Sequence, residues 1–244
     1  MAEISAKKHY ENLLAEHYSW MFGDFNKQVK KNQNWFKEHD VYPKTNQKAI
    51  DLGCGSGFQS FALSSIGFNV TGIDFNEYLL DELKSHDENE TIEVIQSDIL
   101  KPENYSHMAP FELAVCMGDT LTHLSSEESV NNFFHIAYNL LESNGKLIIG
   151  FRDYSVELTG VDRFVPVQND QNKIMTVFLE YESDYLLVHD LVYERNGDSW
   201  EFEKSVYKKV RLSVDRVKYL LEKTNFIIDN LQSNQGMVQI IAAK

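Results

Sequence analysis

The sequence predicts an α/β fold: a doubly wound, seven-stranded and mostly parallel sheet with an inserted antiparallel β subdomain. Three observations predict it. Apolar strands alternate with amphipathic helices from Lys48 to Gly150, which indicates a parallel sheet covered on both faces. A strand runs directly into a glycine loop at residues 49–57. Beyond residue 160 the apolar pattern changes to a period of two, which is typical of antiparallel strands.

Composition and charge narrow the class of protein. The 244 residues are 43% hydrophobic and 25% charged, as in an ordinary globular protein, and we expect residues 1–244 to form a single domain. The formal charge of −14 argues against a surface for nucleic acid phosphates. Neither a transmembrane stretch nor a signal peptide is recognisable, and the two cysteines are too few for a disulfide framework. We therefore expect a cytoplasmic protein.

The elements follow in order from the N-terminus. Residues 1–40 have helical patterns rich in aromatic side chains and are expected to form a lid. The predicted strands of the sheet are Lys48–Leu52, Asn69–Ile73, Ile92–Gln96, Leu113–Met117, Lys146–Gly150, Phe226–Leu231 and Met237–Ala242. The predicted helices are Gln59–Ile66, Glu77–His86, Glu127–Leu141 and Val214–Lys223.

The inserted subdomain is expected over residues 160–212. Four alternating runs, Arg163–Val167, Ile174–Tyr181, Tyr185–Tyr193 and Trp200–Leu212, are separated by turn signals such as Asn196-Gly197, which predicts an antiparallel meander. A basic cluster in the last run (Lys204, Lys208, Lys209 and Arg211) is interpreted as the solvated side of a strand. The meander is expected either to cover the active site or to form a subunit interface.

The glycine loop has the chemistry of a nucleotide-type cofactor site. Gly53, Gly55 and Gly57 let the backbone turn sharply and approach a ligand, and the next helix presents free N–H groups to it. Asp74 ends the second strand, 23 residues after Asp51, where a carboxylate can accept two hydrogen bonds from a ribose diol. A dinucleotide loop would place its third glycine at residue 58, which is Phe58. A purely structural turn and a dinucleotide enzyme are the alternatives.

The region from about Lys48 to Gly150 resembles the class I S-adenosylmethionine-dependent methyltransferases, which have a Rossmann-like sheet. Asp51-Leu-Gly-Cys-Gly-Ser-Gly57 is similar to the first motif of that family. The resemblance implies that Asp74 holds the ribose and Phe75 packs on the adenine. It also implies that Asp98 and Ile99 read and cover the adenine ring. The implied cofactor is S-adenosyl-L-methionine, with S-adenosyl-L-homocysteine as product.

Two further segments resemble the glycine and sarcosine N-methyltransferases. One runs from Val115 to Leu124 and the other from Ile148 to Tyr154. The first places Met117 beside the donor. In the second the resemblance makes Arg152 the group that grips an acceptor carboxylate, which suits its bidentate guanidinium, with Tyr154 helping to orient the acceptor. The alternative for Arg152 is a surface or hinge ion pair.

The chain departs from that group at Asp119, where the pattern has asparagine, and at Phe151, where it has histidine. Asp119 adds a negative charge that can attract an amine or accept its proton, but that repels a carboxylate. The predicted catalytic residues are Asp119, Arg152 and Tyr154. An aromatic segment around Tyr18 resembles the helix that covers the donor in small-molecule methyltransferases, although simple packing on the sheet is equally expected. His123 is either a base or a packing residue. Because no His, Cys, Asp or Glu cluster has ligand spacing, no metal is expected.

These features together predict methyl transfer to a small-molecule acceptor, most simply an amine such as an amino acid. One alternative is an amino-sugar N-methyltransferase, because those enzymes share the aromatic N-terminal helix and an insert after the fifth strand. Another is a protein that senses S-adenosylmethionine without transferring its methyl. The expected partner is a small molecule, with no nucleic acid or membrane, and a homo-oligomer through the β subdomain remains open.

Overall fold

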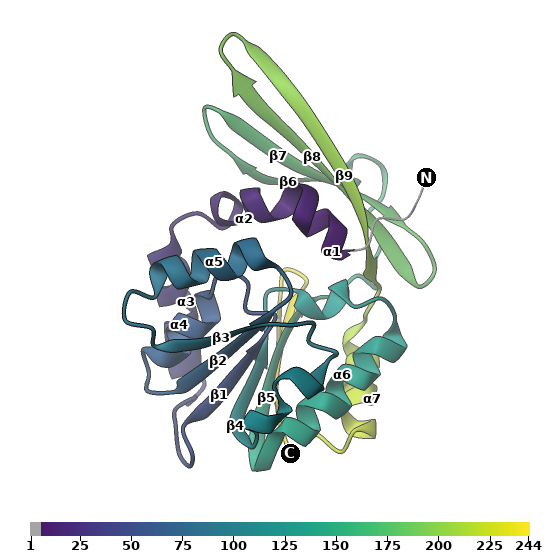
Figure 1. The fold of residues 1–244 in the computed structure, drawn as a ribbon. Helices are drawn as coiled ribbons and strands as arrows, with labels where there is room; N and C mark the ends of the chain where they lie inside the picture. Colours follow the sequence, from purple (N-terminus) through teal and green to yellow (C-terminus); the bar gives the residue numbers. More distant parts are fainter. Residues whose placement is uncertain (1–5) are drawn as a thin grey trace.

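The computed structural model describes residues 6–244 and places two sheets one above the other (Figure 1). The N-terminal helical segment comprises α1 (Ala6–His9), a π-helical turn (Tyr10–Leu14), α2 (Ala15–Phe22) and α3 (Phe25–Glu38). Asp24 begins α3 by accepting a hydrogen bond from the Lys27 N–H at 2.8 Å, a normal N-cap. Residues 1–5 of the expected lid lie outside the described residues.

The larger sheet has seven strands in the order β10-β11-β5-β4-β1-β2-β3. Their bounds are β1 Lys48–Leu52, β2 Asn69–Asp74, β3 Ile92–Gln96, β4 Phe111–Cys116, β5 Leu141–Arg152, β10 Ile227–Asn234 and β11 Met237–Ala243. Strands β1 to β5 pair in parallel, whereas β11 is antiparallel to both of its neighbours. The predicted seven-stranded, mostly parallel and doubly wound sheet is therefore confirmed.

Helices cover both faces of this sheet (Figure 1). On one face α3, α4 (Phe58–Ser64) and α5 (Glu77–His86) bury Phe36, Leu63 and Leu83 against β1, β2 and β4. On the other face α6 (Glu127–Leu140) and α7 (Val214–Lys223) bury Phe133 and Leu221. Because each face of a parallel sheet needs such a cover, the apolar strands and the amphipathic helices form one packing scheme. No helix within residues 6–244 has the length and apolar character needed to cross a bilayer.

The smaller sheet is an antiparallel meander in the order β6-β7-β8-β9. Its strands are β6 Phe164–Asn169, β7 Lys173–Tyr181, β8 Tyr185–Asn196 and β9 Ser199–Val210. Figure 1 shows it above α1 and α2, beyond the edge of the larger sheet where the parallel strands end. Leu13 and Leu14 pack against Met175 and Val192 of the meander. The N-terminal helices are thus held between the two sheets.

One face of the meander does not match the expected solvated strand. Side chains of successive strand residues point to opposite faces, so Lys204 and Lys208 lie on one face of β9 while Lys209 lies on the other with Tyr207. Lys204 is exposed, but Lys209 is only 7% exposed. The interpretation of the whole basic cluster as solvated is therefore wrong for Lys209, because a buried carboxylate partner lies opposite it.

Candidate functional site

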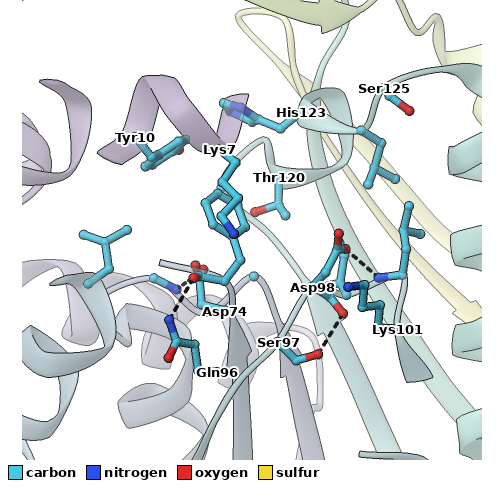
Figure 2. A pocket seen from close by; sticks show the side chains of 18 of the residues that line it. Lys7, Tyr10, Asp74, Gln96, Ser97, Asp98, Lys101, Thr120, His123 and Ser125 are labelled. Carbon is cyan, nitrogen blue, oxygen red and sulfur yellow. Dashed lines mark hydrogen bonds between the residues drawn. The ribbon is translucent and has the colours of Figure 1, made fainter. Parts of the chain in front are cut away.

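A cleft of about 740 Å³ lies at the carboxyl ends of β1, β2, β3 and β4. Figure 2 shows Tyr10 and His123 on one side of it and Asp74, Gln96, Ser97 and Asp98 on the other. Its volume is within the range of small-molecule sites, and its position at the ends of parallel strands is where doubly wound folds bind ligands. The predicted residues that line it are Tyr18, Gly53, Gly55, Asp74, Phe75, Asp98 and Ile99.

The three loop glycines serve different purposes. All have positive φ, at 85°, 51° and 95° for Gly53, Gly55 and Gly57. A Cβ on Gly53 would lie 2.4 Å from Thr120, so this glycine lets the loop after β4 approach. A Cβ on Gly57 would lie 2.8 Å from Leu83, so it allows helix packing. Gly55 faces the hydroxyl of Tyr18 and, unlike Gly57, lines the cleft.

Asp74 joins the first two strand ends. Its carboxylate accepts hydrogen bonds from the backbone N–H groups of Gly55 and Asn76, each at 2.9 Å. The side chain is 8% exposed, and burial raises its pKa above the usual value. Each carboxylate oxygen can accept a second hydrogen bond, so Asp74 can orient the loop and still accept from a ligand in the cleft.

Asp51 lies below the loop and does not line the cleft as the structure describes it. It accepts a hydrogen bond from the Ser60 hydroxyl at 2.6 Å, which ties β1 to the start of α4. Burial raises its pKa to about 7. The pKa of Tyr18 is raised mainly by burial, then by the negative charge of Asp74 and then by that of Asp51. A cation bound above the loop would therefore meet a carboxylate whose ionisation it can change.

Asp98 and Ile99 follow β3 at the opposite end of the cleft (Figure 2). Asp98 is exposed and accepts the Leu100 N–H at 2.9 Å through one oxygen. Ile99 is 7% exposed, and its carbonyl accepts the hydroxyl proton of Tyr105. The turn thus presents an acceptor and an apolar wall side by side, which is suited to a flat heterocycle with an exocyclic amine.

The N-terminal segment closes the cleft from above. Tyr18 stacks on Phe58 with ring centroids 6.2 Å apart, and Tyr10 meets Phe75 edge to face at 5.9 Å. Lys7 reaches into the cleft from α1 (Figure 2). Aromatic pairs of this geometry add to apolar burial. Tyr10 was not among the predicted site residues, because a single tyrosine on a helix gives no signal of its direction.

The predicted catalytic residues Asp119, Arg152 and Tyr154 do not line the cleft. Asp119 and Tyr154 are buried next to it, whereas the Arg152 side chain is exposed. Asp119, 7% exposed, accepts from the Lys209 ammonium at 2.5 Å, from the Arg152 backbone N–H at 2.8 Å and from the Tyr154 hydroxyl at 3.3 Å. Burial alone would lower the pKa of Lys209, but Asp119 and nearby tyrosines raise it well above its usual value. Burial raises the pKa of Tyr154 to about 12. The expected uncompensated charge of Asp119 is thus neutralised by Lys209.

Two other predicted residues also lie away from the cleft lining. The Arg152 side chain is exposed, although its backbone N–H is bonded to Asp119. Met117 is 6% exposed, and its carbonyl accepts the Thr120 hydroxyl proton at 3.0 Å. Both residues therefore contribute, in this structure, through the backbone around the β4 and β5 ends.

A stack of histidine and tyrosine rings connects the cleft to the meander. Tyr207 lies between His9, at 4.1 Å, and His123, at 5.4 Å. His9 bonds Asp190 and Ser205 of the meander, each at 2.7 Å. His123 lines the cleft, and burial, together with the positive charge of Lys209 and His9, lowers its pKa well below the usual value. His123 is therefore neutral at physiological pH.

Lys209, Tyr207 and His9 were missed by sequence reasoning. Their partners described above are 84 to 198 positions away, so the spacing of residues in the sequence could not predict these contacts. The alternation of side chains along β9 was the available signal. It places Tyr207 and Lys209 on one face of the strand and Lys204 and Lys208 on the other.

The sheet order, the loop after β1 and the acids after β2 and β3 define a class of protein: a doubly wound α/β protein with a nucleotide-type cleft. Residues 49–145 match the family described as "Methyltransferase domain". A putative methyltransferase of Geobacillus sp. (strain WCH70) is 24% identical over 187 residues, which are 75% of this chain and 74% of the relative.

Two further proteins are similar to the chain. The glycine/sarcosine N-methyltransferase of Aphanothece halophytica is 27% identical over 126 residues, half of this chain and 44% of that protein. The solved structure of CalS10, an amino pentose methyltransferase from Micromonospora echinaspora, superposes with a TM-score of 0.71 at 10% identity and covers 100% of this chain and 99% of that one. Residues 49–145, about two fifths of the chain, match this methyltransferase family, and the whole chain has the class I methyltransferase fold. These matches identify an S-adenosylmethionine-dependent methyltransferase, and the sensor alternative is set aside.

Proposed function

We propose that the enzyme methylates the nitrogen of a small amine that also carries an anionic group. The match of residues 49–145 to the methyltransferase family supports methyl transfer from S-adenosylmethionine; the small-molecule acceptor, its nitrogen and its anionic group are the proposal. An amino acid and a phosphorylated amino sugar are the two kinds of acceptor that fit this description, and the experiment described below distinguishes them.

The cleft fits the donor at each end. Asp74 has acceptor capacity left for a ribose diol, and the turn at Asp98 and Ile99 suits the adenine ring, with Phe75 on the same wall. Gly53 and Gly55 bring loop backbone to the methionine end, beneath Tyr18. When bound, S-adenosylmethionine supplies an electrophilic methyl on a sulfonium.

Protein side chains then have to align the acceptor and exclude water. Tyr10, Tyr18 and Phe75 cover the cleft with aromatic rings, which keeps the reacting groups away from bulk solvent. Holding two reactants in a productive geometry lowers a barrier by roughly 7–11 kcal/mol in well-oriented cases. Most of the catalysis proposed here is this positioning, so few charged catalytic groups are needed.

The lysines of the cleft carry the proposal for the acceptor. Lys7 and Lys208 line the cleft from α1 and β9, the two elements that cover it, whereas the Arg152 side chain is exposed elsewhere. With Lys101, three cations line a cleft that also contains the carboxylates of Asp74 and Asp98. In a chain with a net charge of −14, this local excess of positive charge favours an anionic substrate group. The names of the two relatives described above, an amino-acid and an amino-pentose methyltransferase, are compatible with an amine acceptor.

The proton of the acceptor ammonium must leave before attack. Asp119 is unsuited to accept it because Lys209, Arg152 and Tyr154 already occupy its carboxylate. His123 is neutral but is a weak base, since its pKa is lowered. We therefore propose that His123 accepts a hydrogen bond from the amine and positions it, while the proton itself is lost to solvent before the cleft closes.

Methyl transfer from labelled donor to a panel of acceptors tests this proposal. The panel contains glycine, sarcosine, free and phosphorylated amino sugars, phenols and a small-molecule extract. We expect transfer to an anionic amine, a KM for it at least about tenfold higher in Lys208→Ala, and little change in Arg152→Ala. The reverse result for the two variants would restore the predicted Arg152 grip. Transfer only to an oxygen would overturn the nitrogen proposal.

Self-association through the meander remains a prediction. Its outer face exposes Phe164, Tyr193, Trp200 and Phe202 by 39 to 51%, and large exposed apolar patches commonly mark interfaces. These side chains support the prediction of a homo-oligomer. Light scattering on the purified chain measures its mass directly, and a monomer at micromolar concentration would contradict it.

A further inference from the structure

A second cluster of ionisable groups lies where α2 meets the meander, apart from the groups assigned above to donor and acceptor. It contains Glu16 and His17 of α2 and Glu203 of β9. One ligand atom from each of the three residues lies within 4.8 Å of the others. The cluster therefore joins two segments that are 186 positions apart in the chain and that are brought together by the fold.

His17 is the unusual member of this cluster. It is 2% exposed, and its Nε2 is a buried atom without a hydrogen-bond partner among the described residues. A buried polar atom without a partner costs about 1–3 kcal/mol and calls for an explanation. Nε2 lies 3.5 Å from the Glu16 carboxylate, which is too long for a normal hydrogen bond.

The same separation suits two ligands of one metal ion. Zinc–nitrogen and zinc–oxygen bonds of about 2.0–2.2 Å in a tetrahedron place two ligand atoms roughly 3.3–3.5 Å apart. Glu16 and Glu203 are exposed and free to adjust their side chains, whereas His17 is held rigidly. Imidazole nitrogen and carboxylate oxygen are both zinc ligands, and a site with three protein ligands leaves the fourth position to water.

The charged groups around His17 also favour a metal ion. The carboxylates of Glu16, Glu194 and Glu203 act on the imidazole, against the ammonium of Lys173. Three negative charges and one positive charge leave an excess of two negative charges, which a divalent cation would neutralise.

We propose that His17, Glu16 and Glu203 form a zinc site that ties the lid helix α2 to strand β9. Figure 1 shows α2 directly beneath the meander, where such a tie would act. Tyr18, the next residue, lines the donor cleft, so the zinc site would hold the helix that forms this wall.

Zinc binding requires the Lys173 side chain to move. Lys173 Nζ lies 2.9 Å from Nδ1 of His17, and it also pairs with Glu194. For Nε2 to ligate, the ring proton must reside on Nδ1, so the lysine must turn away towards Glu194. Glu194 lies 3.8 Å from Nδ1 and can then accept its proton, the carboxylate–histidine–metal arrangement that orients many zinc ligands.

Zinc titration of the chelator-treated full chain against a competing fluorescent chelator tests the proposal without donor or acceptor. We expect one zinc per chain, an affinity at least about 100-fold lower in His17→Ala, and a loss of about 10-fold or more in Glu203→Gln and Glu194→Gln. His135→Ala is the matched control, because His135 is exposed on α6, and it should bind zinc as the unaltered chain does.

Thermal unfolding provides the second measurement. At a zinc concentration 100 times the Kd of the unaltered chain, the midpoint should rise by about 5–10 °C in the unaltered chain and by no more than about half as much in Glu203→Gln, whose affinity is expected to be at least about tenfold lower. Since Glu203 is exposed, that variant can be tested even if His17→Ala fails to fold. The absence of stoichiometric binding, or equal binding by Glu203→Gln, would overturn the site. Neither result depends on which molecule is methylated.

Discussion

The two walls of the cleft are built in different ways. The donor wall consists of short segments that each follow a strand of the larger sheet: Gly53–Gly57, Asp74 and Asp98. The covering wall combines α1, the loop after β4 and β9, joined by His9, His123, Tyr207 and Lys209. The first wall rests on local backbone geometry and the second on long-range polar and aromatic contacts. We infer that donor binding tolerates changes in the meander, whereas acceptor selection depends on them.

The largest effect is expected from Lys209→Met. The substitution leaves the buried Asp119 carboxylate without its cation, and breaking a buried pair in this way costs about 3–5 kcal/mol. Denaturant unfolding should show this loss. The double variant with Asp119→Asn should recover most of it, and Lys208→Met, on the other face of β9, should cost far less. A double variant as unstable as the single one would show that packing, not charge, holds the covering wall together.

Removal of the Asp74 carboxylate tests the donor wall. We expect Asp74→Ala to weaken S-adenosylmethionine binding by about 10–100-fold, because hydrogen bonds to a charged acceptor contribute about 1.5–3 kcal/mol. Calorimetric titration measures the change, and Asp81→Ala, an exposed acid on α5, is the control. Unchanged affinity would remove Asp74 from the ribose role.

His9→Ala tests whether the covering wall and the donor wall act independently. His9 is fully buried and bonds Asp190, itself 1% exposed. Loss of this partner should lower the free energy of unfolding by about 1–3 kcal/mol, while the Kd of the donor should change by less than about threefold. A large loss of donor affinity would contradict the proposed independence of the two walls.

The smallest effect concerns pH. Burial raises the pKa of Asp51 to about 7 in the folded chain, from 3.8 for a solvated aspartic acid. The folded state therefore keeps a proton that the unfolded state releases, and ionisation of Asp51 reduces stability as the pH rises towards 7. A cationic donor favours the ionised form, so donor affinity should rise between pH 6 and 8 by up to about tenfold. Asp51→Asn should flatten the profile; an unaltered slope would assign it to another group.

Much of the fold could be predicted from the sequence because its signals are local. The alternation of strands and helices gave the bounds of β1, β3, α5 and α7 without error, since the apolar period changes at their ends. The ends of β5 and β8 extend further than predicted, to Arg152 and Asn196. There, pairing with β11 and β9 continues the strands into polar residues that have no strand-like pattern.

The predicted site residues also divide into those placed by local signals and those placed by long-range contacts. Those that follow a strand on the donor wall, such as Asp74 and Asp98, line the cleft, because the carboxyl ends of parallel strands meet at one edge. Asp119 also follows a strand, but its position beside a buried lysine depends on a strand 90 residues later. The proposed zinc ligands could not be found by spacing for the same reason.

The sequence by itself determined the α/β class, the cofactor family and the donor wall, because strand period, glycine positions and acids at strand ends are encoded within short stretches. Only the tertiary structure decided that Lys209 neutralises Asp119, that Arg152 is exposed and that His9, Tyr207 and His123 stack over the cleft. The physical reason is that burial and charge pairing depend on which distant strand packs opposite a residue, and short-range patterns do not contain that information.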